Sequence, residues 1–141
     1  MALKPRFLAD KSALARLPNP SVEKRLGPLI LGGEIATCSI IELEVLYSAR
    51  SHRELVQIRK EREAAFPNIE FAQVDFDRAI EVMAALAASG HHRSAGIPDL
   101  LVAAVAERSG LAILHYDQDF DRIASVTGQK VEWVVKRGSV P

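Results

Sequence analysis

The sequence predicts an α/β domain with a mostly parallel central sheet of four to five strands, flanked by helices on both faces. Short apolar segments alternate with helical segments nearly throughout, as they do where crossover helices join parallel strands. The chain has 141 residues, the usual size of a single domain. Hydrophobic residues make up 48% of it and charged residues 26%, which is close to the averages of globular proteins. We therefore expect residues 1–141 to form one domain.

Five short apolar stretches predict the strands of this sheet. The first ends directly at Asp10, and the third alternates apolar and polar residues, a pattern typical of a strand. In chain order, the predicted strands span residues 6–9, 35–38, 69–74, 111–115 and 131–135. A helical segment follows each of the first four.

Seven helical segments complete the pattern, and their ends carry the usual start and stop signals. A Pro-Asn-Pro breaker at 18–20 ends the first helix, and the glycine pair 32–33 follows the second. Ser39 is a suitable N-cap for the third, and Pro67 ends the fourth. Glycine follows the fifth and sixth helices, and proline opens the sixth. The predicted helices span residues 11–17, 21–31, 39–50, 52–66, 75–89, 98–109 and 117–125.

Composition and hydropathy exclude several classes of protein. Cys38 is the only cysteine, so an internal disulfide and a CxxC motif are both excluded. No apolar run approaches the ~18–20 residues of a membrane span, and the first ten residues lack the apolar stretch of a signal peptide. We expect a soluble, cytoplasmic protein with no membrane association. The balance of 18 basic and 18 acidic residues argues at first against a nucleic-acid partner, since such proteins usually carry a basic excess.

Acidic residues recur where a parallel sheet of this kind binds its ligands, beyond the carboxyl ends of the strands. Asp10 follows the first strand, and Asp117 and Asp119 follow the fourth. Asp99 lies in the first turn of the sixth helix. Carboxylates are the ligands that Mg²⁺ and Mn²⁺ prefer, and several close together repel one another without a cation. A divalent ion held there would activate water for phosphodiester hydrolysis.

The helix after the second strand carries two more acids, of which only one can face this site. Residues two apart on a helix are separated by about 200° around its axis. Glu42 shares its face with Val45, and Glu44 shares its face with Tyr47, so both faces carry apolar side chains and the pattern leaves the choice open. Each acid also has an ordinary explanation, as a helix cap or a solvated surface charge.

Four segments of the chain together form a recognisable pattern. They are LADKSAL at 8–14, SIIELEVLYSAR at 39–50, IPDLLVAAVAERSG at 97–110 and LHYDQDFDRIA at 114–124. In order and spacing they resemble the PIN-domain ribonucleases, and specifically the VapC toxins of type II toxin–antitoxin pairs. The resemblance covers nearly the whole chain. The family's pattern of Glu, hydrophobic, any residue, aromatic and small residue falls on residues 44–48, which favours Glu44 over Glu42.

The resemblance implies a PIN-like domain and a Mg²⁺- or Mn²⁺-dependent endoribonuclease. The residues it places in the catalytic pocket are Asp10, Glu44, Asp99 and Asp117, of which Asp10, Asp99 and Asp117 are metal ligands. Ser12 and Asp119 become auxiliary residues, with the Ser12 hydroxyl bonded to a carboxylate or to a metal-bound water. Lys11 and His115 depart from the family, where Thr and a small or hydroxyl residue are common. These departures leave open how the surroundings of the metal are built.

Basic residues close to the acids in sequence are candidates for contacts with RNA phosphates, although each is equally an ordinary surface charge. They are Lys11, Arg16, Arg50, Arg93 and Arg122. Setting the five acids of the predicted site aside leaves 18 basic residues against 13 acidic ones. A net charge of zero is therefore compatible with an RNA substrate, because a bound divalent ion would offset the acids.

The resemblance also implies partners: a cognate VapB-type antitoxin, which in this family binds a groove formed by helices of the region around 52–66, and a second copy in a homodimer. Two alternatives stay open. A catalytically inactive PIN-like interaction module would keep the pocket without turnover. A receiver-type phosphoacceptor needs an acceptor Asp after a middle strand and a Lys near the end of the chain, and Asp75 with Lys130 would fit these requirements only with strain.

Overall fold

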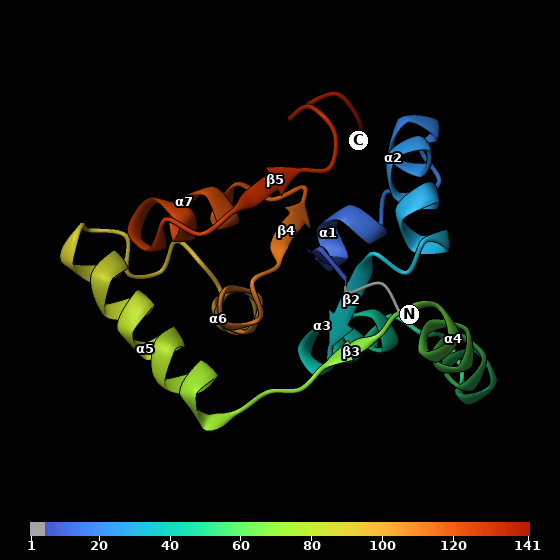
Figure 1. Ribbon diagram of the computed structural model, residues 1–141, viewed down its shortest axis with the longest axis horizontal. Coiled ribbons are helices and arrows are strands. Elements are labelled where there is room, and N and C mark those ends of the chain that lie inside the picture. The colour runs from blue at the N-terminus through green and yellow to red at the C-terminus, as the bar shows by residue number, and fades with distance from the viewer. Residues whose placement is uncertain (1–4) are drawn as a thin grey trace.

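The computed structural model describes residues 5–141 and shows a five-stranded parallel sheet (Figure 1). The strand order is β3-β2-β1-β4-β5, and every neighbouring pair is parallel. The strands are β1 (Phe7–Ala9), β2 (Ile35–Cys38), β3 (Asn68–Ile69), β4 (Ala112–His115) and β5 (Val131–Trp133). The predicted fold class is confirmed. The predicted domain boundaries and the expected lack of a signal peptide also concern residues 1–4, which lie outside the described residues.

Seven helices connect and cover these strands within residues 5–141. They are α1 (Lys11–Leu14), α2 (Pro20–Leu31), α3 (Ser39–Tyr47), α4 (His52–Ala65), α5 (Gln73–Ala88), α6 (Ile97–Ser109) and α7 (Gln118–Thr127). Ser39 is the first residue of α3 rather than its N-cap, a position held by Cys38 without a side-chain bond. Gly110 ends α6 with φ 70°, a left-handed conformation that glycine adopts without strain.

The third predicted strand, at 69–74, is wrong over most of its length. Strand β3 is only two residues long, and α5 already begins at Gln73. The Asp75 carboxylate accepts the backbone N–H of Ala72 at 2.9 Å and thereby caps the first turn of α5. This local bond, rather than the alternation of apolar and polar residues, decides the structure of the segment.

Helices cover both faces of the sheet, and the core divides accordingly into two clusters. Along the strands, neighbouring residues enter opposite clusters: Leu8 and Ile113 join one, and Ala9 and Leu114 join the other. The first cluster includes buried residues of α3, α5, α6 and α7, and the second those of α1 and α2. Helix α6 is buried over seven consecutive residues, 100–106, as expected for a helix that is packed all round.

The topology brings the acidic segments to one edge. From β1 the sheet continues to β2 and β3 on one side and to β4 and β5 on the other. Such a reversal leaves a crevice at the carboxyl ends of the two strands beside it. Here these strands are β1 and β4, with Ala9 opposite Leu114, and they lead directly into Asp10 and the β4–α7 turn. Among the residues described, no helix is both long and apolar enough to span a membrane.

Candidate active site

A pocket of about 370 Å³ opens at the carboxyl ends of β1 and β4. Its four acids come from four separate segments: the end of β1, α3, the first turn of α6 and the β4–α7 turn. It is lined by Asp10, Lys11, Ser12, Ala15, Arg16, Glu44, Pro98, Asp99 and Asp117. The structure therefore brings all four predicted catalytic acids to one pocket.

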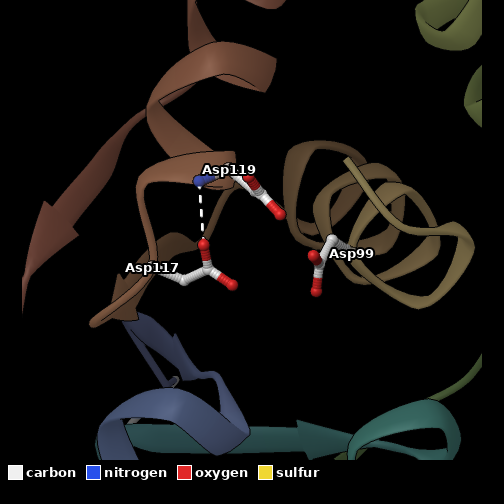
Figure 2. Close-up of side chains that lie close together, drawn as sticks. All are labelled: Asp99, Asp117 and Asp119. Carbon is white, nitrogen blue, oxygen red and sulfur yellow. Dashed lines mark hydrogen bonds between the residues drawn. The ribbon is translucent and has the colours of Figure 1, made fainter. Parts of the chain in front are cut away.

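Three carboxylates at this edge lie close enough to hold one ion. Asp99, Asp117 and Asp119 each offer an oxygen within 4.8 Å of the other two, and all three are half-buried. Figure 2 shows Asp99 of α6 facing Asp117, the N-cap of α7, and Asp119, in the first turn of α7. Asp117 Oδ1 accepts the backbone N–H of Asp119 at 3.0 Å (Figure 2), which caps α7 and fixes the two acids relative to each other. This group of three includes Asp119, which the resemblance implied only as an auxiliary acid. It does not include the predicted ligand Asp10, which lines the pocket together with Asp99 and Asp117.

Asp10 is buried and held from one side only. Its Oδ2 accepts the backbone N–H of Ser12 at 2.9 Å and the Ser12 hydroxyl at 2.6 Å. Ser12 Oγ in turn accepts the N–H of Tyr116 at 2.9 Å, so one hydroxyl ties Asp10 to the β4–α7 turn. Asp10 Oδ1 is buried and has no hydrogen-bond partner within residues 5–141. A buried oxygen of this kind is unfavourable unless a ligand binds it.

The structure separates the two acids of α3. Glu44 lines the pocket, and its Oε1 is buried without a hydrogen-bond partner in the described part of the chain. Glu42 binds Arg62 of α4 through two bonds, Nε to Oε1 at 2.8 Å and Nη2 to Oε2 at 2.7 Å, and also accepts the hydroxyl of Thr37. Burial alone would raise the pKa of Glu42, but the bonds from Arg62 and Thr37 hold it below its usual value. Glu44 is therefore the α3 acid that belongs to the pocket.

The pKa values of three acids are raised by burial and, to a smaller extent, by the charges of their neighbours. Burial, followed by the charges of Asp10, Asp117, Asp119 and Glu44, raises the pKa of Asp99 to about 7. Burial and the nearby Asp10 raise the pKa of Glu44, and burial and Asp117 raise that of Asp119. Without a cation, the pocket therefore takes up a proton near neutral pH.

His115, at the end of β4, is a buried polar residue that sequence reasoning noted only as a departure from the family. Its Nδ1 accepts the backbone N–H of Asp117 at 3.1 Å. The ring lies 5.3 Å from that of Phe120 and 4.9 Å from that of Trp133, measured between centroids. Burial holds the pKa of His115 below its usual value, which agrees with a neutral ring that accepts at Nδ1. Sequence spacing gives no signal for this contact, because it depends on the shape of the β4–α7 turn.

The predicted RNA-binding residues divide into two groups. Lys11 and Arg16 line the pocket, and Arg122 Nη1 lies 3.7 Å from Asp119 Oδ1. Arg50 is exposed after the end of α3, where it pairs with a glutamate of α4, and Arg93 is exposed in the loop before α6. The structure thus places three of the five cations beside the acids.

Arg16 is held at the edge of the pocket by three contacts. Its Nη1 donates to the carbonyl oxygen of Ser12 at 2.8 Å, and its Nε donates to a backbone oxygen of Pro141 at 2.9 Å. The guanidinium lies 4.3 Å from the ring centroid of Tyr116. A cation fixed in this way is available to a phosphate without first being ordered.

The receiver-type alternative finds no support in the structure. Asp75 lies buried at the start of α5, where Arg108 donates to both of its oxygens, at 2.7 Å and 2.9 Å. A phosphoacceptor needs a free oxygen at the carboxyl edge of the sheet, and Asp75 is occupied elsewhere.

The donor set of the pocket fits a hard divalent cation. The lining side chains that can ligate offer only carboxylate and hydroxyl oxygens, the donors preferred by Mg²⁺ and Mn²⁺, and neither imidazole nor thiolate. Two of these oxygens, on Asp10 and Glu44, are buried without a partner among the described residues. The residues present therefore fit the ion that the sequence pattern implies.

Comparison with known proteins identifies the family of the chain. The family model of the PIN domain matches residues 8–126. Ribonuclease VapC21 of Mycobacterium tuberculosis is 46% identical over 134 residues, which cover 95% of this chain and 97% of the relative. Ribonuclease VapC51 of the same organism is 43% identical over 140 residues, with 99% of each chain covered.

Solved structures share the fold at low sequence identity. DNA-bound VapBC from Salmonella typhimurium matches with a TM-score of 0.75 at 18% identity, covering 93% of this chain and 99% of that one. VapBC-1 from nontypeable Haemophilus influenzae matches with a TM-score of 0.74 at 13% identity, covering 95% and 100%. Since the family model spans most of the sequence and VapC relatives above 40% identity span nearly all of it, the chain belongs to the PIN-domain family, within its VapC group.

Proposed function

We propose that this chain is the toxin of a type II toxin–antitoxin pair and acts as a Mg²⁺- or Mn²⁺-dependent endoribonuclease. The observation that carries the proposal is the convergence of four acids from four segments on one pocket, with two buried carboxylate oxygens left for a ligand. The VapC relatives are named ribonucleases, which supports RNA as the substrate.

Each group in the pocket has a defined task in this proposal. Asp99, Asp117 and Asp119 would hold the ion, and Asp10, whose Oδ1 has no hydrogen-bond partner among the described residues, lines the pocket beside Asp99 and Asp117. When bound, the ion supplies an acidified water and a positive charge for the scissile phosphate. Burial and the nearby Asp10 raise the pKa of Glu44, so its carboxylate would accept a proton more readily than an ordinary glutamate.

The basic residues at the rim would partly neutralise the negative charge of the pocket and so favour the binding of RNA. Lys11 and Arg16 line it, and Arg16 is already ordered by Ser12 and Pro141. Phosphate groups bind such donors with little loss of side-chain entropy. These cations would orient the RNA backbone over the acids.

We assign the antitoxin to the surface beside the pocket. A groove of about 230 Å³ is lined by Lys11, Leu14, Ala15, Leu17, Val45, Ser48, Arg62 and Phe66. It shares Lys11 and Ala15 with the acidic pocket. Helix α4, which bounds it, has no fully buried residue. The similar solved structures contain VapBC, which supports an apolar antitoxin segment in this groove. The homodimer stays a prediction.

The test is cleavage by the purified full chain. With Mg²⁺ or Mn²⁺ it should cut a subset of structured RNAs, and excess EDTA should stop the reaction. Asp10→Asn and Asp99→Asn should each lower cleavage at least 100-fold while thermal unfolding stays cooperative. Asp77→Asn, the same change on the exposed side of α5, should cleave like the wild type.

Two results would contradict the proposal. Full cleavage by both pocket variants would overturn the assigned site. Failure of the wild type to bind Mn²⁺ in calorimetry at neutral pH would overturn the metal-dependent mechanism and favour the inactive interaction module.

A further inference from the structure

His115 is the last residue of β4, and its side chain is completely buried. The ring packs against two aromatic side chains, Phe120 and Trp133, and these contacts alone could equally be made by an apolar side chain. Its Nε2 is buried without a hydrogen-bond partner among residues 5–141, and the carboxylate of Asp121 stays 3.7 Å away. Burying an imidazole with one unsatisfied nitrogen is unfavourable. The other nitrogen must therefore supply something that an apolar residue could not.

That other nitrogen binds the backbone of the β4–α7 turn. Nδ1 accepts the N–H of Asp117 at 3.1 Å. The neighbouring N–H groups are held as well: Ser12 Oγ accepts that of Tyr116 at 2.9 Å, and Asp117 Oδ1 accepts that of Asp119 at 3.0 Å. Three of the backbone donors in residues 116–119 are thus fixed by side chains. The position of both acids of the turn depends on these bonds.

The bond at Nδ1 also defines the tautomer of the ring, and Phe120 and Trp133 pack against its plane. Because Nδ1 accepts a hydrogen bond, the proton of the neutral ring lies on Nε2, facing Asp121 Oδ1. Asp121 is held in turn by Trp133, whose Nε1 donates to its Oδ2 at 2.9 Å. The imidazole therefore has a fixed tautomer and a fixed plane, which is what an acceptor needs to set a backbone position.

We propose that His115 is a positioning residue, whose Nδ1 holds the backbone of Asp117 so that the carboxylates of Asp117 and Asp119 stand at the right distance from Asp99 to bind one divalent ion. This inference rests on the proposed function in one respect, the presence of an ion in that cluster. His115 itself touches neither ion nor RNA. It lowers the reorganisation that the turn would otherwise undergo on binding.

The matched pair His115→Asn and His115→Leu tests this. The two new side chains are nearly equal in size, and both leave the space of the ring empty, but only Asn can accept the N–H of Asp117 in place of Nδ1. Calorimetry with Mn²⁺ alone should show affinity weakened about 10- to 100-fold in the Leu variant and within about threefold of the wild type in the Asn variant. The Asn variant should nevertheless have the lower thermal stability of the two, since a buried amide is less favourable than a buried leucine side chain.

Kinetics gives a second readout. The Leu variant should lower kcat at saturating metal and leave KM for RNA within about twofold, because the RNA-binding surface is unchanged. Amide exchange of Asp117, measured by NMR without metal, should become faster in the Leu variant and stay slow in the Asn variant. That measurement needs only a folded chain and no activity.

The Asp99→Asn variant distinguishes a failure of the proposed metal site from a failure of the positioning role of His115. If this variant binds Mn²⁺ like the wild type, the proposed metal site fails, whatever His115 does. If it loses Mn²⁺ while His115→Leu binds normally, the positioning role is overturned and the metal site stands. Equal weakening in the Asn and Leu variants would also overturn the positioning role, since their loss would then follow the missing ring and not the missing acceptor.

Discussion

Asp99 lies where the repulsion among the pocket acids is greatest. It comes from the first turn of α6 and faces the carboxylates of Asp117 and Asp119 (Figure 2). Burial and four neighbouring acids raise its pKa from 3.8 to about 7. A carboxylate in such a position is neutral for part of the time at physiological pH unless a cation is present. The residue is therefore sensitive both to pH and to metal.

The raised pKa of Asp99 predicts a pH-dependent stability in EDTA. The folded chain keeps a proton that the unfolded chain releases above pH 3.8. The stability that this proton contributes is full below about pH 4 and is lost as the pH rises through 7. Asp99→Asn removes the effect, so between pH 5 and pH 8 the variant should gain about 2 kcal/mol relative to the wild type, with solvent screening allowed for.

Urea unfolding at the two pH values measures this difference. Comparison with Asp99→Asn cancels the other titrating groups, including His115, whose lowered pKa acts in the opposite direction. If the free energies of unfolding of wild type and variant changed in parallel with pH, the pKa of Asp99 would not be raised. Excess Mn²⁺ should remove the disadvantage of the wild type, because the ion takes the place of the proton.

For single residues, the sequence predicts which side chains belong to the site but not the hydrogen bonds that they make. Asp10, Asp99 and Asp117 could be predicted because each stands next to a strand end or a helix start. The choice of Glu44 over Glu42 came from the family pattern, since helical spacing alone left it open. The bond from His115 to the Asp117 backbone could not be predicted, because a turn of irregular shape determines which atoms meet.

Two ion pairs join helices α5 and α6: Arg78 with Glu107, and the more deeply buried pair of Asp75 with Arg108. Asp75, in the first turn of α5, is 1% exposed and receives two bonds from Arg108 in the last turn of α6. Arg108 also donates to the carbonyl oxygen of Glu70 at 2.7 Å. Hydrogen bonds from Arg108, which outweigh burial, together with the bond from Ala72, hold the pKa of Asp75 below its usual value. The pair thereby joins the β3–α5 segment to the central helix of the core.

Asp75→Ala should therefore destabilise the chain without touching the pocket. It removes both the cap on the Ala72 N–H and the partner of Arg108, and loss of a cap of this kind is worth about 1–2 kcal/mol. Chemical denaturation should show a lower midpoint with an unchanged slope. Asp75→Asn, which keeps an acceptor for the cap, should lose about half as much. Unchanged stability in the Ala variant would contradict the role given to the pair.

The same segment shows why element boundaries are harder to predict than elements. The alternation in 69–74 is a genuine strand pattern, yet β3 has only one partner strand and ends after Ile69. The cap by Asp75 is local, but the bond that Arg108 donates to Glu70 comes from a residue 38 positions away. Tertiary contacts of this range have no signal in a local window, whereas the seven helices, with their periodic apolar residues and cap signals, do.

The whole molecule has a net charge of zero, yet its acidic residues are not evenly spread. Five acids of the site lie at one edge of the sheet because β1 and β4 are neighbours and both end there. The alternation of strands and helices predicts that carboxyl ends meet at one edge, but the strand order that makes β1 and β4 adjacent follows only from the folded structure. A concentrated negative edge of this kind lowers stability unless a cation occupies it.

This predicts that a divalent ion stabilises the entire fold. An ion that binds the native state alone adds about 2.7 kcal/mol at a concentration of 100 Kd. For a chain of this length, that corresponds to an increase in Tm of about 8 °C. Differential scanning calorimetry with Mn²⁺ and with EDTA measures it on the full chain.

The double variant Asp99→Asn with Asp117→Asn is the decisive comparison. Asn at 117 can still accept the N–H of Asp119 and cap α7, so the fold should persist in EDTA, with a Tm at or above that of the wild type because the repulsion is gone. The increase produced by Mn²⁺ should disappear in this variant and remain in Asp77→Asn. An increase of the same size in the double variant would place the stabilising ion elsewhere, since the only charges removed are those of the acidic edge.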